Sequence, residues 1–290
     1  AAFGSRLNLL TRFSRRFTTE TSESSSLDVS LVSAGLAPIN RTTEDLDDAS
    51  IIGNAQDTKV SVPINLQAVN GISLTMAEIN KSKPEVLSAH LKQKLALKAN
   101  AIAYTVLQSL YGVVTPGNFA DNAITADAAA YDLAKVAEDA VALREAGFPI
   151  PGTVGVLSGG HYAAVTSDPA LAGLVQAGLI TFKEMGAEMT TKDAIPLMHA
   201  ANLPTANNLV GFYAAPDALA VGMRPSARLP EGIELPDGVE LQVLQDDASG
   251  VVMSYYKFFQ PSKQRWVINF ICDYGVAKGN ASALRRIVKA

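Results

Sequence analysis

Ser158 is the side chain in this sequence whose setting best fits nucleophilic chemistry. It lies in GVLSGG, residues 155–160, between an apolar run typical of a strand and residues that can open a helix, which is where a hydrolase holds its serine. His161 and His199 are the candidate bases. The sharp turn of a hydrolase requires glycine two residues before and after the serine, and position 156 is Val. The pattern therefore favours a strand that ends at Gly159 over a catalytic serine.

The other groups that could bind a metal or a phosphate do not form a known motif. The three histidines, His90, His161 and His199, are far apart, and glycine-rich phosphate loops and paired-histidine zinc motifs are absent. An acidic cluster around Asp47 lacks the alternating oxygen ligands and the glycine turn of a calcium loop, so it is typical of a solvated loop. We expect no metal site, no cofactor and no catalytic residue, and therefore no enzyme.

The composition indicates a chain that meets a partner. Of its 290 residues, 48% are apolar and only 18% are charged. The mean hydropathy of +0.15 is high for a monomer that must cover itself with charge. No run approaches the roughly 18 apolar residues of a membrane-spanning helix, so the expected partner is not a membrane. The length favours two modest domains, or one domain with long excursions.

The positive charge gathers at both ends of a chain whose net charge is -4. Residues 1–19 contain no acid and carry Arg6, Arg12, Arg15 and Arg16. Residues 274–290 also contain no acid, and they carry Lys278, Arg285, Arg286 and Lys289. Basic ends on an acidic middle predict that the termini face a polyanion or the acidic surface of another subunit. The first 20 residues also fit a transit peptide, but we interpret them as a retained arm.

Two segments of extended chain need cover. Residues 27–80 show no sustained helical period, and Val60, Val62 and Ile64 alternate with polar neighbours as in a strand. Residues 251–274 form two aromatic-rich runs around a polar turn, which predicts a long hairpin with large side chains on both faces. Cys272 lies in the second run as a small buried hydrophobe. Such ribbons must be covered by the same chain or by a neighbouring copy.

Helices and further strands complete a mixed composition. Apolar residues recur at helical spacing after Pro84, which predicts a helix to about residue 110. A second helix is expected from Asp127 to Ala146, capped by Thr125 or Asp127. The segment GTVGVLS predicts a strand followed by two short helices, and residues 209–225 predict a strand, a turn at Pro216 and another strand. The expected class is α+β.

Taken in order, these pieces resemble the major capsid proteins of tailed bacteriophages, with the Hong Kong-type capsid fold. The resemblance rests on the basic arm, the long extended loop, the long helix, the segments TVGVLSGGHYAAVTSDPALAG and ANLPTANNLVGFYAAPDALAVGMRP, and the closing YGVAKGNASALRRIVKA. It implies a fold built in five parts: an N-terminal arm (1–26), an extended loop (27–80), the spine helix with the first part of a peripheral domain (81–126), an axial domain (127–235), and the return strands of the peripheral domain with the C-terminus (236–290).

The resemblance implies a structural protein of the virion rather than an enzyme. Hexamers and pentamers of identical subunits would form an icosahedral shell, assembled in the host cytoplasm, around non-specifically bound double-stranded DNA. Scaffolding, portal or decoration proteins are the other implied partners. The arm arginines 6, 12, 15 and 16 would face DNA or a neighbouring subunit. The implied loop contacts between subunits are Arg41, Glu44, Asp45, Asp47, Asp48 and Lys59.

Two alternative functions stay open at this point. An encapsulin-like bacterial compartment shell would have the same fold but would carry cargo enzymes in place of DNA. A serine hydrolase using Ser158 is the second alternative. Some capsid proteins also join subunits through a lysine–asparagine isopeptide bond, for which Lys59 with Asn269 or Asn280 would supply the residue types. Lysine and asparagine are too common for this to count as a prediction.

Overall fold

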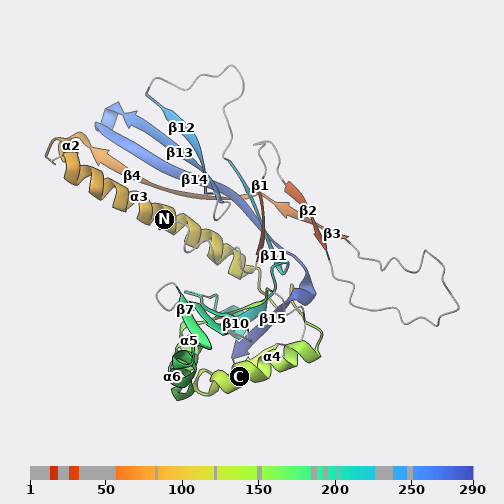
Figure 1. Cartoon of the computed structure of the whole chain (residues 1–290). Coiled ribbons are helices and arrows are strands. Elements are labelled where there is room, and N and C mark those ends of the chain that lie inside the picture. The colour runs from red at the N-terminus through yellow and green to blue at the C-terminus, as the bar shows by residue number, and fades with distance from the viewer. Residues whose placement is uncertain are drawn as a thin grey trace.

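The computed structural model shows an α+β fold in which two sheets share one core (Figure 1). It describes residues 14–18, 26–32, 57–81, 84–120, 123–148, 152–183, 188–191, 195–201, 203–225, 238–246 and 251–289. A third, two-stranded sheet rests on this body at one end and projects from it at the other. The expectation of an α+β class is therefore confirmed.

The first sheet has six strands and is built around the longest one, β14 (Arg265–Lys278). On one edge of β14 lie β13 (Val251–Gln260) and, further along, β11 (Leu219–Arg224), while β4 (Leu66–Thr75) pairs with the opposite edge. All of these pairs are antiparallel. β12 (Glu240–Asp246) extends the sheet beyond β13. The predicted hairpin of residues 251–274 is thus confirmed as β13 and β14.

The long predicted helix is α3 (Pro84–Gly112), which begins at Pro84 as expected. Its 29 residues span ~44 Å and run along one face of the six-stranded sheet (Figure 1). The second half of the helix is buried, with Ile102, Val106 and Leu110 at most 2% exposed. The hydroxyls of Ser109 and Tyr274 lie 2.8 Å apart and tie α3 to β14. Before α3, the short helix α2 (Met76–Lys81) starts with a Thr75–Glu78 capping box.

The second sheet has seven strands, flanked by three helices. The strand order is β5 (Ile124–Ala126), β15 (Leu284–Lys289), β10 (Leu209–Ala214), β6 (Val154–Leu157), β9 (Leu197–His199), β8 (Glu188–Thr191) and β7 (Ile180–Lys183). The helices are α4 (Leu133–Glu145), α5 (Gly159–Thr166) and α6 (Pro169–Gln176). The strand in GTVGVLS and the two helices that follow it are as predicted from the sequence.

The predicted start of the second helix is wrong. Residues Ala128–Ala130 form a separate 3₁₀ turn, and α4 begins only after Asp132, whose carboxylate accepts a hydrogen bond from the backbone N–H of Lys135. Three acids or hydroxyls in this stretch could each cap a helix, and the hydrogen bond of Asp132 decides among them. The predicted end is right, because Gly147 takes a positive φ of 69° just beyond the helix.

The two sheets are joined by the short turn between β10 and β11. These strands are consecutive in the chain, yet β10 belongs to the seven-stranded sheet and β11 to the six-stranded sheet. One hydrophobic core therefore includes residues from both sheets and from α3, and Tyr111 of α3 contacts Phe212 of β10 edge to face at 6.0 Å. Helix α3 is in this way the common support of both sheets.

The C-terminal basic residues are not all surface charges. β15 is an inner strand, hydrogen-bonded to β10 on one side and β5 on the other. Arg286 is 8% exposed, and its Nε donates a 3.0 Å hydrogen bond to the backbone carbonyl of Phe119. The expectation that this arginine faces a polyanion is wrong, because its guanidinium satisfies a buried carbonyl of the same chain.

Candidate assembly surfaces

Ser158 and His161 are brought together by the start of α5. The Ser158 Oγ and the His161 Nδ1 lie 3.0 Å apart, and Ser158 is the residue that precedes the helix. Burial lowers the pKa of His161, so its ring is neutral at physiological pH. Among the described residues, no carboxylate hydrogen-bonds to the buried Nε2 of this ring. The pair thus lacks the acid that would orient a catalytic histidine.

His199 reaches the same region but serves packing. Its Nε2 lies 3.4 Å from the point where a side chain on Gly159 would begin, and its ring contacts Tyr162 at 5.7 Å. The ring of this β9 histidine thus packs against the start of α5. Within the described part of the chain, no cluster of three potential metal ligands is found, and no helix is long and apolar enough to cross a membrane.

Most of the residues assigned to subunit contacts from the resemblance lie outside the described residues. These are Arg6, Arg12, Arg41, Glu44, Asp45, Asp47 and Asp48. Arg15 and Arg16 lie in β1 (Ser14–Thr18), whose backbone pairs in parallel with Ala220 and Val221 of the chain's own β11. Lys59 lies in β3 (Asp57–Pro63), opposite Ser30 of β2 (Ser26–Val32). The part of the arm that the structure describes thus begins on its own subunit.

The face of the six-stranded sheet opposite α3 carries an apolar surface that sequence reasoning did not resolve by residue. Register places Val69 of β4, Ile271 of β14, Ser254 of β13 and Val243 of β12 in one row across four strands. The two ends of this row are exposed, Val69 by 54% and Val243 by 42%, whereas Ser254 within the row is 0% exposed. We call this surface, with its further members, the outer sheet face; the other apolar members are Leu241, Tyr256, Phe258 and Val267.

The sequence did hold a signal for this surface. Alternate residues of a strand point to opposite faces, and residues 251–274 carry large apolar side chains at both alternations. One set, with Phe270 and Cys272, faces α3 and belongs to the core. The other set, with Tyr256 and Phe258 in ring contact at 5.3 Å, is only half-buried. The prediction that this hairpin has two apolar faces is confirmed.

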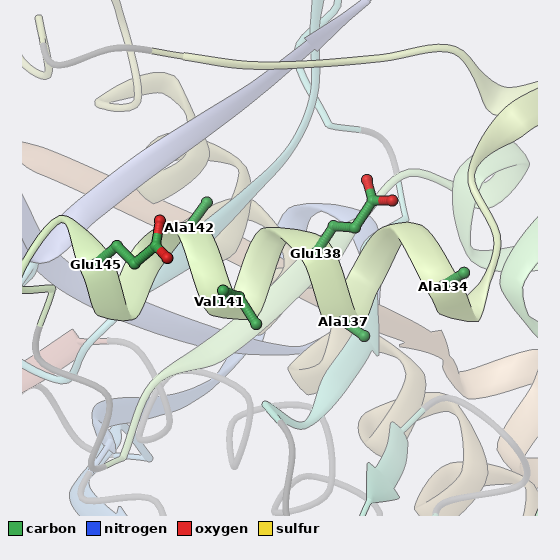
Figure 2. A pocket seen from close by; sticks show the side chains of 6 residues that line it. All are labelled: Ala134, Ala137, Glu138, Val141, Ala142 and Glu145. Atoms are coloured by element: carbon green, nitrogen blue, oxygen red, sulfur yellow. The ribbon is translucent and has the colours of Figure 1, made fainter.

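A second exposed apolar area lies on α4, at the other end of the molecule. A shallow hollow of about 540 Å³ runs along the outward side of this helix (Figure 2). It is lined by Ala134, Ala137, Glu138, Val141, Ala142 and Glu145. Val141 is 51% exposed, while Val136 and Leu143, on the inward side, belong to the core. The helix thus has small and apolar side chains on both sides.

The third candidate surface is the hairpin of β2 and β3, which projects away from the two sheets (Figure 1). Its register sets Leu27 opposite Val62 and Val29 opposite Val60, so one alternation of each strand is apolar. The predicted strand character of Val60 and Val62 is confirmed, whereas Ile64 lies between β3 and β4 and not in a strand. A two-stranded hairpin in isolation is marginally stable in water, which makes the projecting part of this one a candidate contact surface.

Comparison with solved structures identifies the fold. The capsid of cyanophage P-SCSP1u matches 95% of this chain and 86% of its own, with 13% identity and a TM-score of 0.51. The mature capsid of bacteriophage PhiM1 matches 97% and 86%, with 8% identity and a TM-score of 0.51. The SrpI encapsulin of Synechococcus elongatus matches 98% and 87%, with 12% identity and a TM-score of 0.50. No protein-family model and no curated protein sequence matches the chain.

The chain therefore has the fold of tailed-phage capsid proteins, which the encapsulin shares. The match covers nearly the whole chain. The resemblance read from the order of the sequence segments is confirmed at the level of the fold. At this sequence identity the comparison defines the architecture, and function has to be argued from the surfaces.

Proposed function

We propose that this chain is a major capsid protein that self-assembles into an icosahedral shell around double-stranded viral DNA. The observation that carries the proposal is the capsid fold over nearly the whole chain, combined with an apolar outer sheet face and a hairpin that projects from the body. Both features are unfavourable in an isolated monomer and are satisfied when copies overlap.

We assign a different contact in the shell to each of these surfaces and segments. The far end of the hairpin with Lys59, and the residues between its strands with the basic and acidic positions 41 to 48, lie on a neighbouring copy. The arm arginines at positions 6, 12, 15 and 16 contact phosphates of packaged DNA or an acidic neighbour. Each contact is modest, and repetition in hexamers and pentamers adds them together. Scaffolding, portal or decoration proteins complete the particle.

The proposed location is the virion, after assembly in the host cytoplasm, and the proposed role is structural. Ser158 and His161 are placed as a helix-start pair without an orienting acid among the described residues, which supports a non-catalytic role. The five-part division of the chain stays a proposal. Its loop segment, residues 27–80, contains β4, which is a full member of the six-stranded sheet.

An encapsulin-type shell is the second candidate, because an encapsulin matches the fold as well as the phage capsids do. The two candidates differ in what the shell contains. Particles purified from the native source and treated with nuclease should retain double-stranded DNA if the chain forms a virus capsid. An encapsulated enzyme and no protected DNA would overturn the capsid proposal in favour of a compartment shell.

A further inference from the structure

Four small residues form a platform where β11 and β14 run side by side. Ala220 of β11 is opposite Ala277 of β14, and Gly222 is opposite Gly275. Because alternate strand residues share a face, these four positions lie on one face of the strand pair. The intervening residues are Val221 and Val276, which are opposite each other; Val221 belongs to the core that contains α3, and Val276 packs against it. We call the four residues the small-residue platform.

The base of the β2–β3 hairpin rests on this platform. Val62 of β3 is 0% exposed and forms a buried cluster with Ala220, against which Leu27, Val60 and Ala277 pack. The apolar alternation of the hairpin is therefore covered at its base by the chain's own sheet. The far end of the hairpin, at Val32 and Asp57, extends away from it.

The two glycines of the platform matter for the space they leave rather than for their backbone conformation, and the space is tighter at Gly275 than at Gly222. Neither has a positive φ. A Cβ on Gly275 would collide with the backbone carbonyl oxygen of Pro63 and would lie 3.2 Å from the Cα of Ile64. A Cβ on Gly222 would lie 3.2 Å from Cγ1 of Val62. At Gly275 the obstacle is backbone, so no side-chain rotation can relieve it.

We propose that Gly222 and Gly275 fix the direction in which the β2–β3 hairpin leaves the subunit. We call this pair the glycine seat, because the base of the hairpin rests on it. Each hairpin strand has seven residues and spans ~23 Å, so a small displacement at the base becomes a larger one at the far end. Resting on the proposed capsid function, the same pair determines which part of a neighbouring copy the hairpin reaches. Gly222 and Gly275 are thus positioning residues for assembly.

The direction of the hairpin can be measured between two spin labels. One label is attached at Asp57→Cys, at the far end of β3, and the other at Ser262→Cys, in the exposed turn between β13 and β14. The native Cys272 is 0% exposed and burial raises its pKa to about 12, so it does not compete for the label in the folded protein. Labelled chain is mixed with excess unlabelled chain, so that only distances within one copy are recorded.

Gly275→Ala should shift the label-to-label distance by several ångströms, because the hairpin base must move until Pro63 is at a van der Waals separation of ~3.5 Å. Far-UV circular dichroism reports whether the variant folds. Gly222→Ala should give a smaller shift, since its obstacle is a side chain. Adding Val62→Ala to Gly222→Ala removes that obstacle and should return the distance toward that of the parent protein.

Gly211→Ala is the matched control, because its Cβ would meet the backbone carbonyl oxygen of Val156 at 2.7 Å in the other sheet. It should destabilise the fold and leave the label distance unchanged. An unchanged distance in a folded Gly275→Ala variant overturns the inference. If Gly275→Ala does not fold, an unchanged distance in Gly222→Ala overturns it instead.

The same samples separate this inference from the proposed function. Shell formation by the unlabelled parent protein is scored by electron microscopy, independently of the label distance. If the glycine variants shift the label distance but the parent protein forms no shells, the role of the glycine seat is supported and the capsid proposal is contradicted. If Gly275→Ala forms normal shells and the label distance is unchanged, the capsid proposal is supported and the role of the glycine seat is contradicted.

Discussion

Asp139 is a buried carboxylate held between two tyrosine hydroxyls. It is 3% exposed, and its Oδ2 accepts hydrogen bonds from Tyr131 at 3.1 Å and from Tyr213 at 3.3 Å. The Nζ of Lys135 lies 3.6 Å from its other oxygen. Burial raises the pKa of Asp139 and outweighs the opposing effects of the two tyrosines and the lysine. The network satisfies these polar atoms in the core of the seven-stranded sheet, but the burial of the carboxylate makes its charged form less favourable.

Replacing Asp139 with asparagine should make the subunit relatively more stable as the pH rises. In the folded parent protein the pKa of Asp139 is raised above its ordinary value of 3.8. At pH values between these two pKa values, the folded state therefore binds more protons than the unfolded state. The free energy of unfolding of the parent protein therefore decreases as the pH rises through this range, by about 1.4 kcal/mol for each unit of pKa shift. Asp139→Asn has no such proton to lose.

Urea unfolding of both proteins at about pH 4, 5.5 and 7.5 measures this difference. Comparison at equal protein concentration is needed because assembly adds stability. The free energy of unfolding of Asp139→Asn, relative to the parent protein, should increase from the lowest pH to the highest. A relative stability that instead decreases with pH would show that the charged carboxylate stabilises the folded state.

At the scale of the elements, charged substitutions on the outer sheet face should have little effect on folding of the subunit and should strongly reduce assembly into shells. Val69→Glu with Val243→Glu places two carboxylates on exposed positions, at an expected cost of about 0.5–1 kcal/mol each. If a neighbouring copy covers this face, those charges lose their water on assembly, which is much more costly. The double variant should fold normally and form at least tenfold fewer particles by sedimentation, ~1.4 kcal/mol of assembly free energy.

The matched control for this variant is Gln93→Glu with Gln108→Glu. It adds the same two charges at exposed positions of α3, on the opposite side of the sheet. Assembly of the control should be close to that of the parent protein. Equal particle yields from both double variants would show that the outer sheet face is not a contact between copies.

Sequence patterns predicted the elements that carry their own periodicity. The helical spacing after Pro84 gave α3, and the two-sided apolar pattern of residues 251–274 gave β13 and β14 with their need for cover. Local chemistry was less decisive at the start of α4, because Thr125, Asp127 and Asp132 can all cap a helix. Element type was therefore more predictable than element boundary.

Contacts between distant parts of the chain could not be predicted in this way. The pairing of β1 with β11, and the assignment of β10 and β11 to different sheets, depend on tertiary packing that no local pattern encodes. The small-residue platform is a clear case, since Gly222 and Gly275 each look like an ordinary strand glycine. The prediction that Arg286 faces a polyanion or another subunit failed for the same reason, because its partner is the distant carbonyl of Phe119.

At the scale of the whole molecule, α3 supports two sheets while the hairpin and the outer sheet face extend beyond that core. A monomer of this shape would leave exposed positions of the outer sheet face, such as Val69 and Val243, in water, although the chain has a core sufficient to hold its two sheets together. In a shell of identical copies, neighbouring subunits would cover these exposed positions without any change of fold. The capsid fold and the uncovered surfaces therefore support the same conclusion.

The most direct test of this account is electron microscopy of the purified full chain, with sedimentation of the same sample at micromolar concentration and physiological salt. We predict closed icosahedral particles, or the hexamers and pentamers from which they are built. A stable, monodisperse monomer under these conditions would contradict the proposal that this protein completes its surface by assembling with copies of itself.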